Sequence, residues 1–142
     1  MENKFTARFN YPVKILVAWG EAISGNGDIR DWLLKNGYPE LGLFTFALRN
    51  QDEAMAWLIK NNFPHLAALI NGMEGNKQAL QWLGDNGFST LKLMAYVGDG
   101  NEEATKILMK SDKLLAMLAL KMGAVKDEIE RDNNDVHKFS KN

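Results

Sequence analysis

Hydrophobic and polar positions recur along this chain with a period of 25 residues. A pair of large hydrophobic residues stands at Trp32 and Leu33 and returns at 57–58, 82–83 and 107–108. A residue type that often closes helices follows each pair at the same interval, namely Gly37, Asn62, Gly87 and Asp112. A fixed period of this length is typical of a supersecondary unit that is copied along the chain and stacked on its neighbours.

The first half of each unit predicts a short helix, which we call A-type. It begins at a polar residue whose side chain can accept a hydrogen bond from the free N–H groups of the first turn. Acidic residues follow in three copies, where they suit the positive end of the helix dipole. The helix ends about ten residues later at a residue that tolerates the left-handed conformation. The four predicted first residues are Asn26, Gln51, Asn76 and Asn101.

The second half of each unit predicts another helix, which we call B-type. An aromatic residue followed by Pro or Ser marks its start, as at Tyr38-Pro39. Hydrophobic residues then recur at spacings of three and four, which is the helical period. The same register predicts one B-type helix around Trp19 and a last one around Ala119. The pattern therefore predicts five B-type helices, four A-type helices and a separate trailing helix from about Val125.

These elements predict an all-α fold without strands, a right-handed, superhelical α-solenoid of short helical hairpins. A unit of this length cannot bury its own hydrophobic face, so stability must come from stacking. We expect one domain over residues 1–142, because a chain of this size can bury a sizeable core. The polar residues 127–135 suit a capping end, and we expect residues 133–142 to be frayed. The predicted repeats span about 16–40, 41–65, 66–90, 91–115 and 116–140.

One segment of the unit is similar to a known repeat family. Residues 75–88, Gly-Asn-Lys-Gln-Ala-Leu-Gln-Trp-Leu-Gly-Asp-Asn-Gly-Phe, resemble the outer-helix half of an ankyrin repeat, and residues 100–108 follow the same pattern. The Thr-Pro-Leu-His start of the inner ankyrin helix and the loop finger are missing, because the unit is shorter than the ankyrin period of about 33 residues. The resemblance implies stacked helical hairpins that bind other macromolecules along an extended surface.

Charge and composition narrow the function classes. The chain has 17 Lys and Arg against 18 Asp and Glu, so its net charge of -1 gives no bulk positive field for nucleic acid. It has no Cys, which excludes disulfides and thiolate metal sites. No stretch is long and hydrophobic enough to span a membrane, so we expect a soluble, cytoplasmic monomer. A nucleic-acid-associated protein stays the alternative, through the lysines Lys106, Lys110, Lys113, Lys121 and Lys126.

No group of residues points to catalysis, so we expect neither an enzyme nor a cofactor. The serines lack the flanking glycines of a nucleophile elbow, and no Gly-rich phosphate loop is present. The two histidines, His65 and His137, have no partner at metal-ligand spacing. Residues 99–103 alternate oxygen ligands but lack the spacing of a calcium loop, so helix capping explains them better. An enzyme or a small-molecule site hidden in a groove is the third hypothesis.

Two columns of the repeat lead to predictions about which side chains are buried and which are exposed. The tryptophans at 32, 57 and 82 are predicted to form the core between repeats, with an exposed stacking platform as the alternative. The column of Glu40, His65, Thr90 and Leu115 varies in polarity, so we expect it to be exposed at the start of the B-type helices.

Two further columns predict the functional surface. Their residues change chemical type from copy to copy and lie on one face of the B-type helices. Aromatic residues and Arg on such a face are enriched at protein interfaces, although an ordinary solvated face would also fit. We therefore expect an adaptor that binds a protein or peptide along the B-helix surface. The predicted partner-binding residues are Glu21, Phe46, Arg49, Asn71, Glu74, Tyr96, Asp99 and Lys121, with Ser24 in the same columns.

Overall fold

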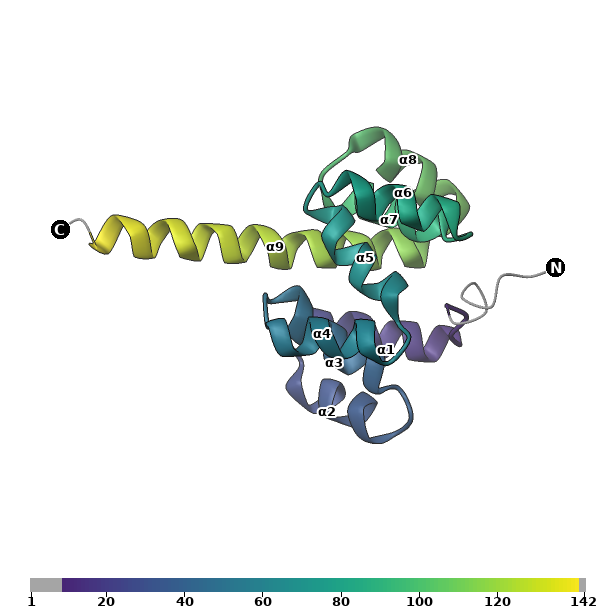
Figure 1. The fold of residues 1–142 in the computed structure, drawn as a ribbon, viewed down its shortest axis with the longest axis horizontal. Helices are drawn as coiled ribbons and strands as arrows, with labels where there is room; N and C mark the ends of the chain where they lie inside the picture. Colours follow the sequence, from purple (N-terminus) through teal and green to yellow (C-terminus); the bar gives the residue numbers. More distant parts are fainter. Residues whose placement is uncertain (1–8, 141–142) are drawn as a thin grey trace.

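The computed structural model describes residues 9–140, with side chains as far as Asn133. This part of the chain is all-α without a strand, as predicted, and contains nine helices (Figure 1). The helices are α1 (Val13–Ile23), α2 (Gly27–Lys35), α3 (Pro39–Leu48), α4 (Asp52–Lys60), α5 (Pro64–Met73), α6 (Lys77–Asp85), α7 (Ser89–Gly98), α8 (Glu102–Ser111) and α9 (Lys113–Ser140).

The four A-type helices α2, α4, α6 and α8 begin directly after the predicted residues, but only the three asparagines cap with their side chains, since Gln51 before α4 makes no such hydrogen bond. The side-chain oxygen of Asn26 accepts a hydrogen bond from the N–H of Ile29 at 3.1 Å, and the asparagines before α6 and α8 do the same. Three of the four predicted closing residues have positive φ, for example 95° at Gly37. Asp112 differs, because its φ is -155° and its side chain accepts the N–H of Leu115 at the start of α9.

The predicted separate helix from about Val125 is wrong, because α9 runs without interruption to Ser140. The earlier B-type helices are each followed by a left-handed residue, at Gly25, Asn50, Gly75 and Gly100. The same position in the fifth copy holds Val125, and a β-branched residue adopts positive φ only with strain. The backbone is helical as far as Ser140. The predicted fraying of residues 133–142 stays a prediction, because the side chains beyond Asn133 lie outside the described part.

The five B-type helices form an inner layer that closes on itself. Each neighbouring pair in the series α1, α3, α5, α7 and α9 is in contact, and α9 also contacts α1 and α3. Figure 1 shows α1 and α9 running in the same direction, with α9 continuing well beyond the other helices. The stacked hairpins are confirmed, whereas an open superhelix is not, because the first and last B-type helices meet.

The core lies inside this ring. Trp19 of α1 and Phe44 of α3 are fully buried and meet edge to face, with ring centroids 5.0 Å apart. Each A-type helix contributes a buried leucine at the same repeat position to this core, Leu33, Leu58, Leu83 and Leu108, and α6 also buries Leu80. Burial of a leucine or isoleucine side chain stabilises a fold by roughly 1.5 to 3 kcal/mol, so these columns hold the layers together.

The predicted tryptophan core is wrong. Trp32 is 47% exposed, and Trp57 and Trp82 are only half-buried. Trp57 instead stacks on Phe63, with ring centroids 6.1 Å apart. Trp82 stacks in the same way on Phe88, with centroids 6.0 Å apart. The tryptophans precede the buried leucines by one residue, which turns them about 100° away from the inward stripe of a helix that packs on one side only.

The predicted exposure of the column around His65 is also wrong. His65 is fully buried, Glu40 and Leu115 are nearly so, and only Thr90 is exposed. The imidazole of His65 lies flat against the ring of Phe88, with centroids 4.7 Å apart. Glu40 is covered from another side, because the hydroxyl of Tyr11 donates a hydrogen bond to its carboxylate at 2.8 Å.

Candidate functional site

The first predicted surface column lies on the outward side of the B-type helices. Phe46 lies under the guanidinium of Arg30 from α2, 4.6 Å from the ring centroid. Asn71 and Tyr96 are half-buried, and Glu21 is exposed. Lys121 donates a hydrogen bond to Ser24 at 3.0 Å, so it joins α9 to the end of α1.

The second predicted column lies at the C-terminal ends of the B-type helices. Ser24, Arg49, Glu74 and Asp99 are all exposed there. Glu74 forms an ion pair with Lys126 of α9, which also donates a hydrogen bond to Asn50 at 2.9 Å. The structure therefore brings Ser24 and Glu74 to α9, and Asp99 lines a hollow together with Glu74 and Lys126. Arg49 stays on the surface.

A groove that sequence reasoning missed lies over α5, between α4 and α6. It is shallow and open to solvent, with a volume of about 360 Å³. Ile59 of α4, which is 56% exposed, and the half-buried Trp82 of α6 form its hydrophobic walls. We call this site the α5 groove, and it is lined by Ile59, Pro64, Ala67, Ala68, Asn71, Asn76, Gln78, Ala79 and Trp82.

The groove exists because the middle unit has small residues where its neighbours have large ones. The outward positions of α3 hold Leu43 and Phe46, and those of α7 hold Leu93 and Tyr96. The same two columns hold Ala68 and Asn71 in α5. A column-by-column comparison of residue size would have predicted this hollow, whereas a search for aromatic residues pointed to the filled positions on either side.

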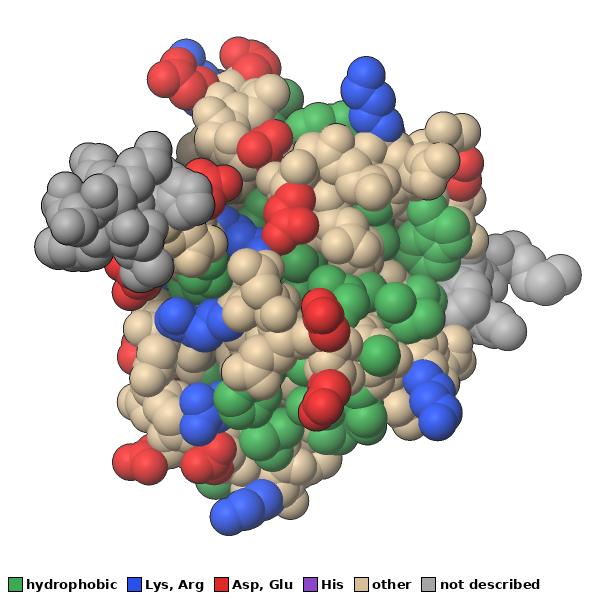
Figure 2. Space-filling model, turned by 60° about the vertical axis from the view of Figure 1, so that its left-hand side comes forward, with side chains coloured by type: hydrophobic (Ala, Val, Ile, Leu, Met, Phe, Trp, Pro, Cys, Tyr) green, Lys and Arg blue, Asp and Glu red, His purple; other side chains and the backbone are tan. Residues whose placement is uncertain are grey.

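A second hollow adjoins the α5 groove at Asn71. It encloses about 300 Å³ between α3, α4 and α5, and both Met55 and Glu74 line it. Asn71 lines both hollows. Figure 2 shows that hydrophobic side chains form a connected area on one face of the molecule, interrupted by acidic side chains and bordered by basic ones.

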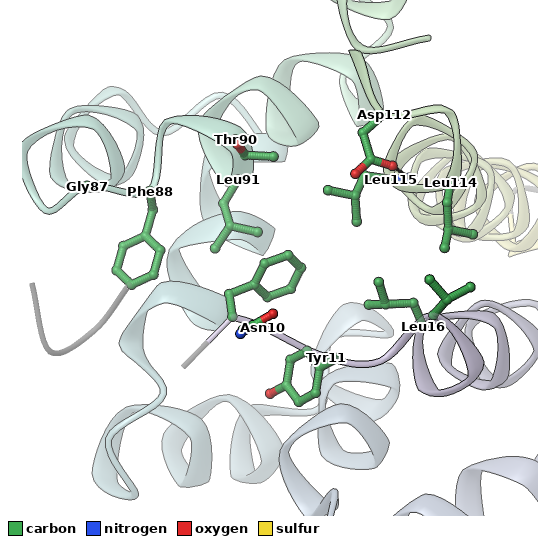
Figure 3. A pocket seen from close by; sticks show the side chains of 12 residues that line it. Asn10, Tyr11, Leu16, Gly87, Phe88, Thr90, Leu91, Asp112, Leu114 and Leu115 are labelled. Atoms are coloured by element: carbon green, nitrogen blue, oxygen red, sulfur yellow. Dashed lines mark hydrogen bonds between the residues drawn. The ribbon is translucent and has the colours of Figure 1, made fainter. Parts of the chain in front are cut away.

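A larger cavity of about 520 Å³ lies where the first turns of α1, α7 and α9 meet (Figure 3). Its lining mixes hydrophobic side chains such as Leu16 and Leu91 with polar ones such as Thr90. Asp112 is the one carboxylate among its described lining residues, and it already caps α9. A hollow of about 530 Å³ between the ends of α5 and α7 and the middle of α9 is more acidic, because Glu74, Asp99, Asp127 and Glu130 line it.

The other predicted chemistry finds limited support in the described residues. They contain no group of three or more His, Asp or Glu that could hold a metal ion, and the side chain of His137 lies outside them. Of the five lysines of the nucleic-acid alternative, Lys121 and Lys126 are engaged with other side chains, whereas Lys106, Lys110 and Lys113 are exposed. Among the described helices, none combines the length and hydrophobicity that crossing a bilayer requires.

Comparison of the chain with protein-family models, with curated proteins and with solved structures gave no match. The ankyrin resemblance therefore stays a prediction from the capping pattern of residues 75–88 and 100–108.

Proposed function

We propose that this protein is a protein-binding module and that its α5 groove receives a bulky hydrophobic side chain from a peptide segment of the partner. The replacement of a large outward pair by Ala68 and Asn71 in the middle unit carries this proposal. It also places one of the predicted partner-binding residues, Asn71, inside the groove.

The dimensions and chemistry of the groove support a side-chain anchor. A volume of about 360 Å³ is at the lower end of ligand-binding pockets, which suits one aromatic or leucine side chain better than a large cofactor. Interface energy is concentrated in such buried anchors. Asn71, Asn76 and Gln78 carry amides that can both donate to and accept from the backbone of an extended peptide.

The test fills the groove with residues that the fold already accepts elsewhere. The double variant Ala68→Leu/Asn71→Phe copies the pair of α3 into α5, so we expect it to fold with nearly unchanged thermal unfolding. A peptide library displayed on phage is selected against the native protein, and enriched peptides are then measured against both proteins. We expect an aromatic or leucine anchor in the enriched peptides and at least a tenfold loss of affinity in the filled variant, roughly 1.4 kcal/mol or more.

A control variant keeps the groove open and changes the surface of a helix that does not line it. The variant Lys106→Ala, on the exposed side of α8, should bind the selected peptides like the native protein. Peptides that bind the filled variant equally well would show that the α5 groove is not the site. The triple variant Phe46→Ala/Arg49→Ala/Tyr96→Ala then measures whether the partner extends along the predicted stripe.

A further inference from the structure

The cavity between the first turns of α1, α7 and α9 lies apart from the proposed peptide site. None of its lining residues also lines the α5 groove. Its volume of about 520 Å³ falls within the range of small-molecule pockets, roughly 300 to 1,000 Å³. The cavity is therefore large enough for a ligand of its own.

The repeat register explains why this part of the molecule is open. At the junction of α5 and α7, Phe88 lies flat against His65, and both residues are buried. One unit later the same two positions hold Lys113 and Thr90. Both are exposed, and Thr90 lines the cavity whereas Lys113 does not. The junction of α7 and α9 therefore lacks the aromatic ring that closes the preceding junction.

The walls of the cavity are held in place by contacts within the protein. The ring of Phe9 meets two others edge to face, with centroids 5.7 Å from Tyr11 and 6.2 Å from Trp19. The hydroxyl of Tyr11 donates a hydrogen bond to Glu40 at 2.8 Å, which joins the segment before α1 to the start of α3. The cavity is thus pre-formed, and a ligand does not have to order these walls when it binds.

The lining combines a hydrophobic interior with a small number of polar groups. Leu16, Leu91 and Leu115 come from three different helices and point into the cavity (Figure 3). Thr90 and Asp112 add a hydroxyl and a carboxylate, and both residues are exposed to solvent. Asp112 caps α9 through one oxygen, but a carboxylate can accept several hydrogen bonds. The described lining thus offers hydrophobic surface together with one negatively charged acceptor.

We propose that this cavity binds a small molecule that combines an aromatic ring with an amine. The ring takes the place of the missing aromatic side chain beside Thr90, where Leu91 and Leu115 remove its surface from water. The ammonium group donates a charge-assisted hydrogen bond to Asp112. An acidic ligand is disfavoured, because it would bring a second negative charge to the same place.

Three probes that share one ring test this chemistry. Phenethylamine, phenethyl alcohol and phenylacetate each carry two carbons on a phenyl ring and differ in the polar group. We expect phenethylamine to bind the full chain saturably, with a dissociation constant below about 1 mM and with backbone NMR shifts at 9–16, 88–91 and 112–115. Phenethyl alcohol should bind about threefold or more weakly, since its hydrogen bond is not assisted by charge. Phenylacetate should not bind.

Substitutions at the cavity locate the binding. Thr90→Phe adds a ring in the column where α5 already buries His65, so we expect it to fold and to weaken phenethylamine binding about tenfold or more. Ser89→Phe adds the same ring at the adjacent residue, which is exposed and does not line the cavity, so binding should stay unchanged. Asp112→Asn keeps a side chain that can cap α9 and should weaken the binding of the amine but not of the alcohol.

Several outcomes would overturn the proposal. These are the absence of saturable binding, equal loss with Thr90→Phe and Ser89→Phe, and phenylacetate binding as tightly as phenethylamine. If Thr90→Phe does not fold, Asp112→Asn decides, and an unchanged affinity for the amine would be contrary to the proposal. The filled α5-groove variant Ala68→Leu/Asn71→Phe should bind phenethylamine like the native protein. A loss of binding in that variant would place the ligand in the α5 groove instead.

Discussion

Tryptophan side chains meet three environments in this molecule, and their energetic roles differ accordingly. Trp19 is fully buried inside the ring of B-type helices, Trp32 is 47% exposed, and Trp57 is half-buried against Phe63. The free energy lost on truncation depends on the contacts removed and on how well the site can collapse. Identical residues one repeat apart thus contribute unequally to stability.

Truncation of two tryptophans measures this difference. We expect Trp19→Ala to lower the free energy of unfolding by about 3 to 5 kcal/mol, because it opens a cavity beside Phe44. Trp57→Ala should lower it by only about 1 to 2 kcal/mol, since Trp57 is only partly buried and packs against the edge of the core. Urea unfolding followed by circular dichroism gives both values. Equal losses would restore the predicted tryptophan core.

A conservative change at Trp19 addresses its polar atom. The indole Nε1–H of Trp19 is buried and has no acceptor among the described residues. Trp19→Phe removes that donor together with part of the ring, so the lost packing and the relieved desolvation oppose each other. We expect a change below about 1.5 kcal/mol in urea unfolding. A loss as large as that of Trp19→Ala would show that the indole nitrogen makes a stabilising contact.

Individual residues also show which structural features could be predicted from the sequence and which could not. Cap positions such as Asn26 could be predicted because a helix end needs a local hydrogen-bond acceptor, which the sequence displays directly. The burial of His65 could not, because it depends on Phe88, which lies 23 positions away and arrives only by stacking. The α5 groove was missed for a related reason, since it is an absence of side-chain volume at Ala68.

At the scale of elements, the approach of α9 to α7 is set by a glycine. A Cβ at Gly123 would lie 2.5 Å from the carbonyl oxygen of Gly98, which is backbone and cannot rotate away. Gly84 in α6 is the contrast, because its nearest neighbour is the flexible end of Lys92 at 3.3 Å. Close packing therefore requires a glycine at Gly123 but not at Gly84.

The same substitution at the two glycines should change stability in opposite directions. Gly123→Ala forces α7 and α9 apart, and we expect it to destabilise the fold by about 1 to 3 kcal/mol. Gly84→Ala should stabilise it by about 0.5 to 1 kcal/mol, because alanine favours the helical backbone. Thermal and urea unfolding of both variants provide the measurement. Stabilisation by Gly123→Ala would mean that the two helices are not closely packed at this point.

The element scale also explains why the end of the fold was predicted incorrectly. The period indicated a boundary near Val125, but a period fixes where a turn can occur and not whether the residue there permits it. Val125 replaces a residue of the left-handed column, and Lys126 replaces the capping residue that follows. Both local signals for a turn are missing, so α9 continues. Lys126 then lies within α9 and forms an ion pair with Glu74 of α5.

At the scale of the whole molecule, closure couples the two ends of the described chain. In an open repeat array each unit contacts only its neighbours, and opening at one end leaves the other intact. Here α1 packs on α9, with Leu118 buried at that contact. Loss of packing in the last unit should therefore be felt in the first.

Hydrogen exchange distinguishes a closed array from an open one. We expect Leu118→Ala to destabilise the fold by about 2 to 4 kcal/mol and to raise amide exchange in both α1 and α9. Exchange resolved by mass spectrometry assigns the effect to each helix. Leu69→Ala in α5, on the far side of the ring, serves as the comparison. Faster exchange confined to α8 and α9 would show that the ends behave independently.

Closure also fixes how many units the molecule can hold. An open stack can gain or lose a hairpin at either end and keep the geometry of the rest. A ring of five B-type helices around Trp19 and Phe44 has no such freedom. A sixth helix would widen the centre, and a ring of four helices would leave no room for both aromatic side chains. Duplication of a 25-residue unit would thus require a new core, so the copy number is under steric control.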